Sequence, residues 1–421
     1  MTITHQPTDV TAVPGLRVAY DGQVYAAEMV GRGAAYELFS EQPEAGFQPD
    51  PRGGAARWRR FVHATEVAAI YAADDPPAGA PAGDLPETPL RVPLSRMVGW
   101  TDVHRWSQTP ARGGSTAIDA IRATATVRRG TRMMKVLSAH QLAGCLSGWP
   151  PSGFCYREYD IAHLRTPDAL RLVRTDPDTA ADTGNVTFAL RWPAVDPADY
   201  DVPTPAVQSG LIDMPPHDRV GPPVLGTGFT PSEHHIIPEF TTAALADLPL
   251  PANATLLAYP ADGSEVVLYT YQPEQRGWLR MVGAQWRHLL AGVNGVSATQ
   301  EYVPVAPAGP TASSRLVGWF RGREHDAVAD PPTEFRVLAM TRAARYPVES
   351  LLRRTHFTWW RRERCTVVRQ NGSWVRLRLS RPSPEAVVNL GARCYERGVY
   401  ETWAPTAEIS RIEPVDTPYA I

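Results

Sequence analysis

The sequence predicts an α+β protein dominated by β-strands, built by tandem duplication of a small SH3-like or open β-barrel module and a mixed α/β module. Three observations lead to this fold class: repeated segments, evenly spaced strand signals, and stretches rich in proline and glycine. The chain has 421 residues, enough for about two to four domains at roughly 100–200 residues each. Hydrophobic residues make up 43% of the chain, so several cores can be filled.

Repeated segments occur in the same order in both halves of the chain. Ser95–Trp100 reads SRMVGW and Ser314–Trp319 reads SRLVGW, so five of six residues are identical. Upstream, Val18–Gly22 (VAYDG) resembles Leu257–Gly263 (LAYPADG). A tryptophan and a cysteine six residues apart also recur, as Trp149 with Cys155 and as Trp359 with Cys365. Such recurrence indicates a duplicated structural unit.

Proline and glycine divide the predicted repeat into modules. Both residue types interrupt helices and central strands, and they are concentrated in Asp74–Pro93 and Asp196–Pro223. The predicted plan is a disordered N-terminus (1–15), a small β-barrel module A1 (16–73), a linker (74–94), a mixed module B1 (95–195), a Pro-rich connection (196–251), a second barrel module A2 (252–306) and a second mixed module B2 (314–416).

The A modules show short alternating strand signals separated by turn residues. In A1 the hairpin signal Asp21-Gly22 separates the first two strands, because both turn positions tolerate positive φ. The strands predicted for A1 are Leu16–Tyr20, Val24–Val30, Tyr36–Phe39, Arg57–Val62 and Val67–Tyr71. Those predicted for A2 are Thr255–Tyr259, Val266–Tyr271, Trp278–Val282, Trp286–Leu290 and Glu301–Val305.

The B modules are expected to combine helices with strands. In B2, Tyr346-Pro347-Val348-Glu349 predicts a helix start, since proline suits the first helical position and an early glutamate favours the helix dipole. Val348, Leu351 and Leu352 continue at helical spacing. Strands over Cys365–Arg369 and Ser373–Leu379, joined by a turn at Asn371-Gly372, should follow. For B1 the predictions are a helix over Val136–Leu146 and strands over Phe154–Ile161 and Ala169–Val173.

Charge and composition narrow the function classes. The net charge is −2, which argues against nucleic acid or an anionic membrane as the partner of the whole chain. Only Lys135 among the 42 basic residues is lysine, and the chain has 41 prolines. This composition is typical of a GC-rich bacterial genome, so abundant arginine is weak evidence for arginine chemistry.

Targeting and cofactor signals are missing from the sequence. No Sec signal is visible and no apolar run approaches the ~18 residues of a spanning helix, so we expect a cytoplasmic protein without a membrane partner. The four cysteines, Cys145, Cys155, Cys365 and Cys394, show no CxxC spacing. We therefore predict no metal and no cofactor, and we expect Cys155 and Cys365, which occupy equivalent places in the two halves, to be buried small hydrophobic residues.

One short string points to catalysis. His234-His235-Ile236-Ile237-Pro238 resembles the HHI(I/V)P element of HNH and endonuclease VII-type nucleases. The resemblance implies that one of His234 and His235 ligates a metal and the other activates water. A metal site of this kind needs further ligands from one ββα finger. Asn253 follows His235 by 18 residues, but the next histidine, His288, lies 53 residues on, inside module A2. We therefore expect the histidine pair to lie in the connection, packed against Ile236 and Phe240.

A basic and aromatic cluster in B2 is the predicted binding site. It consists of Arg353, Arg354, Trp359, Trp360, Arg361, Arg362 and Arg364. Such residues can bind nucleic acid by phosphate contact and stacking, and arginine and tryptophan are also enriched at protein-binding hot spots. The matching B1 segment keeps Trp149 and Cys155 but has no arginine, so the shared residues should be core and the basic face should belong to B2.

The favoured function is that of a non-enzymatic protein that binds another protein through its β modules. A toxin-neutralising (immunity) protein or a secretion or assembly adaptor would fit. Two alternatives stay open: a metal-dependent nuclease acting through His234 and His235, and nucleic-acid binding through the Arg/Trp cluster of B2. The GxSxG, HExxH, Walker and GxGxxG motifs do not occur in the sequence.

Overall fold

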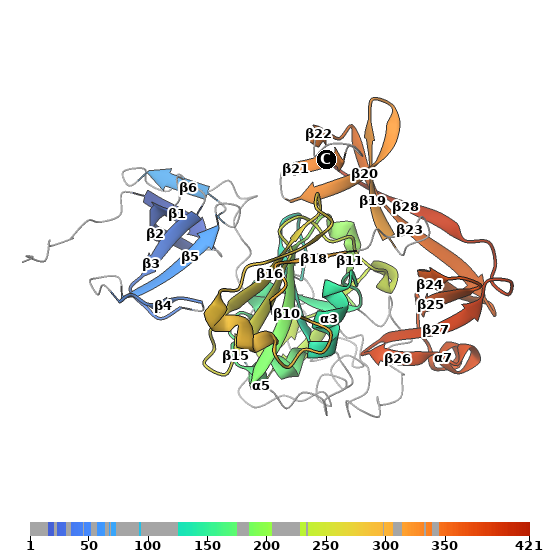
Figure 1. Ribbon diagram of the computed structural model, residues 1–421, viewed down its shortest axis with the longest axis horizontal. Helices are drawn as coiled ribbons and strands as arrows, with labels where there is room; N and C mark the ends of the chain where they lie inside the picture. Colours follow the sequence, from blue (N-terminus) through green and yellow to red (C-terminus); the bar gives the residue numbers. More distant parts are fainter. Residues whose placement is uncertain are drawn as a thin grey trace, which may run out of the picture. The chain divides into compact units, whose positions relative to one another are not determined.

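β-Strands dominate the structure, a computed structural model of the whole chain (Figure 1). It describes residues 16–20, 23–30, 35–44, 46–51, 57–63, 67, 69–72, 92–93, 125–174, 185–203, 228–232, 235–297, 299–305, 314–331, 334–338 and 345–421. The chain divides into two units, Met1–Pro89 and Leu90–Ile421, here called the N-terminal unit and the large unit. The described sheets are antiparallel and none of them closes, which confirms an α+β, β-dominated protein.

The N-terminal unit contains one open sheet with the strand order β4-β5-β3-β2-β1-β6. All five strands predicted for A1 form within two residues of their expected bounds. Tyr20 lies opposite Gln23, which is the register expected when two residues separate β1 from β2. Tyr20, Leu38 and Val62 contribute to the core on one face. The strands are β1 (Leu16–Tyr20), β2 (Gln23–Val30), β3 (Ala35–Ser40), β4 (Gln48–Pro49), β5 (Trp58–His63) and β6 (Ala69–Ala72).

A nine-stranded sheet, β11-β14-β9-β8-β10-β15-β16-β17-β18, forms the centre of the large unit. In it β10 pairs with β15, so strands from the predicted modules B1 and A2 share one sheet. The seven-part division of the chain remains a prediction. The strands are β8 (Arg132–Leu137), β9 (Phe154–Arg157), β10 (Val186–Pro193), β11 (Tyr200–Asp201), β14 (Phe240–Thr242), β15 (Thr255–Pro260), β16 (Val266–Gln272), β17 (Gly277–Arg280) and β18 (Tyr302–Pro304).

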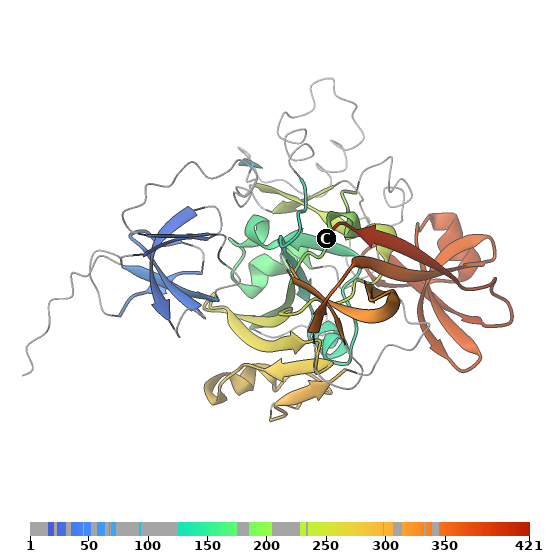
Figure 2. The ribbon, with the colours of Figure 1, turned by 90° about the horizontal axis from the view of Figure 1, so that it is seen from above.

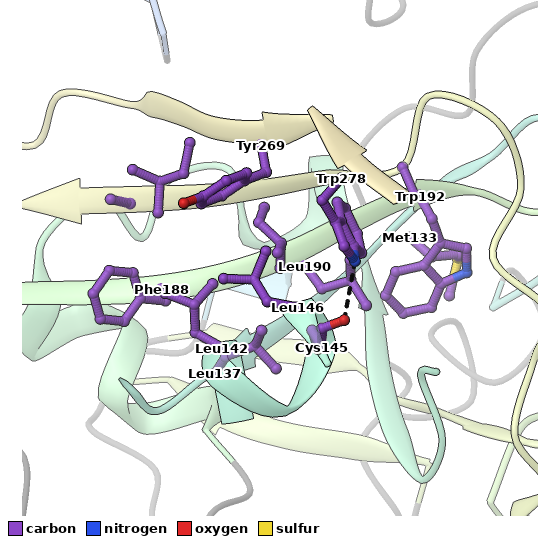
Figure 3. Close-up of a cluster of buried hydrophobic side chains, with 14 of the residues drawn as sticks. Met133, Leu137, Leu142, Cys145, Leu146, Phe188, Leu190, Trp192, Tyr269 and Trp278 are labelled. Carbon is purple, nitrogen blue, oxygen red and sulfur yellow. Dashed lines mark hydrogen bonds between the residues drawn. The ribbon is translucent and has the colours of Figure 1, made fainter. Parts of the chain in front are cut away.

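Helix α3 (Ala139–Leu146) covers one face of this central sheet. Ser138 caps the first turn of α3. The apolar face of the helix supplies Leu142 and Leu146 to the largest hydrophobic cluster among the described residues, here called the main core. Figure 3 shows these side chains against Trp278, whose indole N–H donates to the Cys145 carbonyl at 3.0 Å. The buried tryptophan thus keeps its polar atom satisfied while its ring fills the core.

The C-terminal sheet has the order β22-β21-β20-β19-β23-β24-β25-β27-β26, and β28 pairs with β23. The long strand β23 pairs with β19 and β28 over its first part and with β24 at its end. This region is orange and red in Figures 1 and 2. Its elements are β19 (Ser314–Phe320), β20 (Arg323–Asp330), β21 (Glu334–Leu338), β22 (Arg345–Pro347), β23 (Ser350–Trp360), β24 (Glu363–Asn371), β25 (Trp374–Leu379), α7 (Pro384–Leu390), β26 (Arg393–Glu396), β27 (Val399–Pro405) and β28 (Glu413–Tyr419).

Smaller elements complete the large unit. β7 (Val92–Pro93) and β12 (Phe229–Ser232) flank β13 (His235–Pro238) in a three-stranded sheet. Short helical turns connect the larger elements: α4 (Glu158–Ile161), α5 (Pro167–Leu170), η3 (Arg171–Val173), η4 (Pro197–Asp199), η5 (Ala243–Leu245) and η6 (Ala284–Leu290). None of the described helices is long and apolar enough to cross a membrane.

Several predicted elements were wrong. The helix expected to begin at Tyr346 is replaced by β22 and β23, because β23 gains backbone partners on both edges, from β19 and β28, and this pairing outweighs local helical spacing. Trp286–Leu290 lies in the 3₁₀ helix η6 rather than in a strand. Thr166 caps a helical turn at Pro167, so Ala169–Val173 is helical. The predicted helix over Val136–Leu146 is the end of β8 followed by α3.

The repeated segments can be located only in part. Ser314–Trp319 lies in β19, whereas Ser95–Trp100 lies outside the described residues. Trp149 follows α3, while Trp359 lies in β23, so the two Trp–Cys pairs have different local structures.

Truncation of the α3 core should destabilise the large unit strongly. We expect Leu142→Ala to lower the free energy of unfolding by about 2–5 kcal/mol, because it removes fully buried methyl groups and leaves a cavity. Val388 on α7 is 81% exposed, so Val388→Ala should change it by less than about 0.5 kcal/mol. Urea unfolding followed by tryptophan fluorescence measures both. Equal losses would contradict the described core.

Candidate functional site

The predicted Arg/Trp cluster lies on the β23–β24 hairpin, and its members separate into buried and exposed side chains. Arg353 is buried, and its Nε lies 2.7 Å from Asp199 Oδ1. Tyr419 donates to the same carboxylate oxygen at 2.6 Å. Burial raises the pKa of Asp199, while Arg353 opposes that rise. Arg353 therefore joins β23 to the central region and is not available to a partner.

Arg354 links three strands of the C-terminal sheet. It donates from Nε and Nη2 to the two oxygens of Asp416 at 2.7 and 2.8 Å, and from Nη1 to Glu324 at 2.9 Å. The paired hydrogen bonds lower the pKa of Asp416 below its usual value. This pairing ties β23 to β20 and β28.

The turn of the hairpin carries the exposed members. Trp360 is buried in the C-terminal core, and the Arg361 guanidinium lies 4.5 Å from its ring centroid. The Arg364 guanidinium lies 3.9 Å above the Phe357 ring. Trp359 is 51% exposed, and Arg362 is exposed beside it. The hairpin therefore offers Trp359, Arg361, Arg362 and Arg364 to solvent.

The histidine string is only partly described. His234 lies outside the described residues, and His235 is known only as a backbone position of β13, opposite Ser232. Ile236 and Phe240 are buried. His288 is exposed on η6, and its ring contacts the Gln285 carbonyl. In the described part of the chain, no group of three or more His, Cys, Asp or Glu residues could hold a metal ion. The nuclease resemblance stays a prediction.

Three of the four cysteines are buried, and Cys394 is half-buried. Burial raises the pKa of Cys145, Cys155 and Cys365 to about 12 in each case. Such thiols stay protonated at neutral pH, and the thiolate is the nucleophile in cysteine chemistry. All four cysteines are free.

A second group of aromatic and arginine side chains lies on the outer face of the C-terminal sheet. Along β25, Val375, Leu377 and Leu379 point into the core against α7, and the alternation of a strand places Trp374 and Arg376 on the opposite side. Trp403 on β27 lies opposite Arg376 and shares this side. We call the group formed by Arg369, Trp374, Arg376, Tyr395 and Trp403 the aromatic face.

The side chains of the aromatic face are close together and open to solvent. Trp374 pairs with Pro405, so Trp374 and Trp403 are diagonal neighbours across β25 and β27. The Arg376 guanidinium lies 4.4 Å from the Tyr395 ring centroid and also pairs with Glu401. Trp374, Tyr395 and Trp403 remain 48%, 41% and 39% exposed.

The same side of β25 is covered further along the strand. Arg378 is fully buried, with its Nη1 2.6 Å from Asp247 Oδ1 and 2.9 Å from the Leu245 carbonyl oxygen. Its Nη2 lies 2.8 Å from Glu401 Oε1. The segment around η5 therefore covers the Arg378 end of this side and leaves the Trp374 end open.

The C-terminal sheet is basic although the chain is not. Residues 314–421, which contain this sheet, have eighteen arginines and twelve carboxylates, a net charge of +6, in a chain whose net charge is −2. Arg369 and Arg393, at the edges of the aromatic face, are exposed and form no ion pair with any described carboxylate.

Comparisons with protein-family models, curated proteins and solved structures found no match for this chain.

Loss of Arg378 should be far more damaging than loss of Arg376. Arg378→Ala leaves Asp247 and Glu401 buried without their shared cation, which we expect to cost about 3–5 kcal/mol of unfolding free energy. Arg376 lies two residues away and is partly exposed, so Arg376→Ala should cost about 1 kcal/mol or less. Chemical denaturation of both variants tests this. A smaller loss of unfolding free energy for Arg378→Ala than for Arg376→Ala would contradict the burial of Arg378 beneath the η5 segment.

The Arg354–Asp416 pair should stabilise the protein only while Asp416 is ionised. The pKa of Asp416 is lowered in the folded state. The contribution of the pair to folding stability is therefore fully present above the ordinary carboxylate pKa of about 3.9, and it is lost as the pH falls through the lowered pKa of the folded state. Asp416→Asn should cost about 0.2–1 kcal/mol at neutral pH. In urea titrations at successively lower pH, the difference from wild type should shrink and then disappear as the pH falls through the lowered pKa of Asp416. A constant difference would contradict the pairing.

Proposed function

We propose that this chain is a non-enzymatic binding protein that recognises another protein through the aromatic face. The observation that carries the proposal is the exposure of Trp374, Tyr395 and Trp403 around Arg376 on one side of an ordered sheet. Exposed aromatic clusters keep apolar area in contact with water, so a partner that covers them gains binding free energy. Tryptophan, tyrosine and arginine are also the residue types enriched at binding hot spots.

The geometry favours protein over nucleic acid at this face. Arg376, at its centre, is already paired with Glu401, so the middle of the face is not a bare cation. A nucleic-acid groove needs a continuous row of cations along the phosphate backbone. Here Arg369 and Arg393, which pair with no carboxylate in the described part of the chain, lie at the edges, an arrangement that supports an apolar contact bordered by charge. The basic charge of the sheet favours a partner with an acidic surface.

We infer a finer architecture for the N-terminal unit, that of an SH3-like module. The order β5-β3-β2-β1-β6 is a meander whose last strand returns beside its first. The hairpins β1–β2 and β15–β16, which carry the similar VAYDG and LAYPADG segments, support a duplicated origin. A cytoplasmic toxin-neutralising protein and a secretion or assembly adaptor are the two settings that we propose for such a binder.

A capture experiment with matched tryptophan variants tests the proposed function. The full chain is immobilised and exposed to nuclease-treated lysate of the native host, and retained proteins are identified by mass spectrometry. The purified partner should bind in solution, and the double variant Trp374→Ala/Trp403→Ala should weaken binding at least about 30-fold, since even one hot spot contributes about 2 kcal/mol. Trp359→Ala, which removes an equally exposed tryptophan outside the face, is the control.

Three outcomes would contradict the proposal. Retention of no protein by the wild-type chain is one, and equal binding by wild type and the double variant is another. The third is retention of nucleic acid, from lysate without nuclease, that is lost in Trp359→Ala. This last result would favour the exposed Arg/Trp hairpin turn as a nucleic-acid site.

A further inference from the structure

The single lysine of the chain lies in a buried polar cluster that the aromatic face does not use. Lys135 projects from β8 on the same side as Met133 and Leu137 of the main core, and its side chain is 4% exposed. Its Nζ lies 2.7 Å from Glu396 Oε2 and donates to the Ser152 carbonyl. Glu396, at the end of β26, is completely buried.

A glutamine side chain completes the cluster. Gln141, in the first turn of α3, donates from Nε2 to the same oxygen, Glu396 Oε2, at 3.3 Å. Its carbonyl oxygen Oε1 accepts from the Ser138 backbone N–H at 3.0 Å. One carboxylate oxygen therefore bridges an amine and a carboxamide, while a backbone N–H polarises the carboxamide carbonyl.

We propose that Lys135 and Gln141 become joined by an intramolecular isopeptide bond, with Glu396 as the proton carrier. The Lys135 ammonium gives a proton to Glu396, and the free Nζ attacks Gln141 Cδ. The Nζ–Cδ bond forms, the Cδ–Nε2 bond breaks, and Glu396 returns a proton to the departing nitrogen. One ammonia leaves and takes up the second proton that Nζ loses, so the products are a secondary amide and an ammonium ion, without an oxidant or cofactor.

Four physical features favour this reaction. The fold holds amine and carboxamide beside one carboxylate, which replaces a bimolecular encounter. The Ser138 N–H is placed to stabilise negative charge developing on Gln141 Oε1. Proton transfer from Lys135 to Glu396 removes two charges from a buried site, where charge is costly. Burial of all three side chains limits competing hydrolysis.

The bond would form only after the large unit has assembled. Gln141 and Glu396 are separated by 255 positions in the chain, so the proton carrier arrives only when the C-terminal sheet packs on the central sheet. Once formed, the amide ties β8 to the first turn of α3 without needing the C-terminal sheet. The proposal is independent of the aromatic face and of any partner.

Because the chain has one lysine, the test gives a clear reading. The full chain is purified after folding, denatured, and measured by intact mass spectrometry, and a second sample is digested with endoproteinase Lys-C. A free chain has the sequence mass and is cut once, after Lys135, into two fragments. The isopeptide-bonded chain is lighter by one ammonia and is not cut. Tandem mass spectrometry of the tryptic peptide should place the bond between Lys135 and Gln141.

Variants assign the roles of the three residues. Lys135→Arg and Glu396→Gln should both keep their full sequence masses, whereas Glu385→Gln, which changes an exposed carboxylate on α7, should still lose one ammonia. The wild-type measurement decides the matter even if Glu396→Gln fails to fold. A wild-type chain of full sequence mass that Lys-C cuts completely would overturn the proposal. So would loss of one water with a bond from Lys135 to Glu396, which would make Glu396 the acceptor.

Discussion

Buried ion pairs between the central sheet region and the C-terminal sheet determine the arrangement of the large unit. Breaking a buried pair costs several kcal/mol, whereas an intact pair adds little net stability over apolar packing. These pairs therefore disfavour other positions of the C-terminal sheet on the central region, because any shift between the two would leave buried charges without partners. The pairs are Lys135 with Glu396, Asp199 with Arg353, Glu239 with Arg397, and Asp247 with Arg378.

This docking also decides which surface remains open. On the outer side of β25, Asp247 and the Leu245 carbonyl hold Arg378, so that end of the strand faces protein. Four residues earlier along the same side, Trp374 faces solvent. A single strand thus supplies a buried contact within the chain and an exposed one for a partner. The contacts of Arg378 fix the backbone of β25 at its buried end, so binding at the exposed end need not order that backbone.

Local sequence signals predicted the fold where contacts are local. Tyr20 pairs with Gln23, as the Asp21-Gly22 signal predicts for the β1–β2 hairpin. The Asn371-Gly372 signal missed the β24–β25 turn by one residue, since Asn371 pairs with Trp374. Ser383, Pro384 and Gly391 mark the ends of α7 and could have predicted it. Pairing between residues far apart in the sequence was not predictable. Arg353 pairs with Asp199, 154 positions away, so Arg353, which the sequence predicted to bind a partner, is buried instead. The alternation along Trp374–Leu379 was a usable signal for the aromatic face.

The choice of lysine at position 135 has a physical explanation within this arrangement. Arginine supplies the other 41 basic residues, and three of them already serve in buried pairs between the same regions. A guanidinium could neutralise Glu396, but it stays protonated in proteins and is a poor nucleophile. An amine can pair with the carboxylate, give it a proton and then attack a neighbouring carboxamide. The one position where lysine is kept is the one where a buried carboxylate also contacts a glutamine amide, so side-chain chemistry, rather than charge alone, accounts for the residue found there.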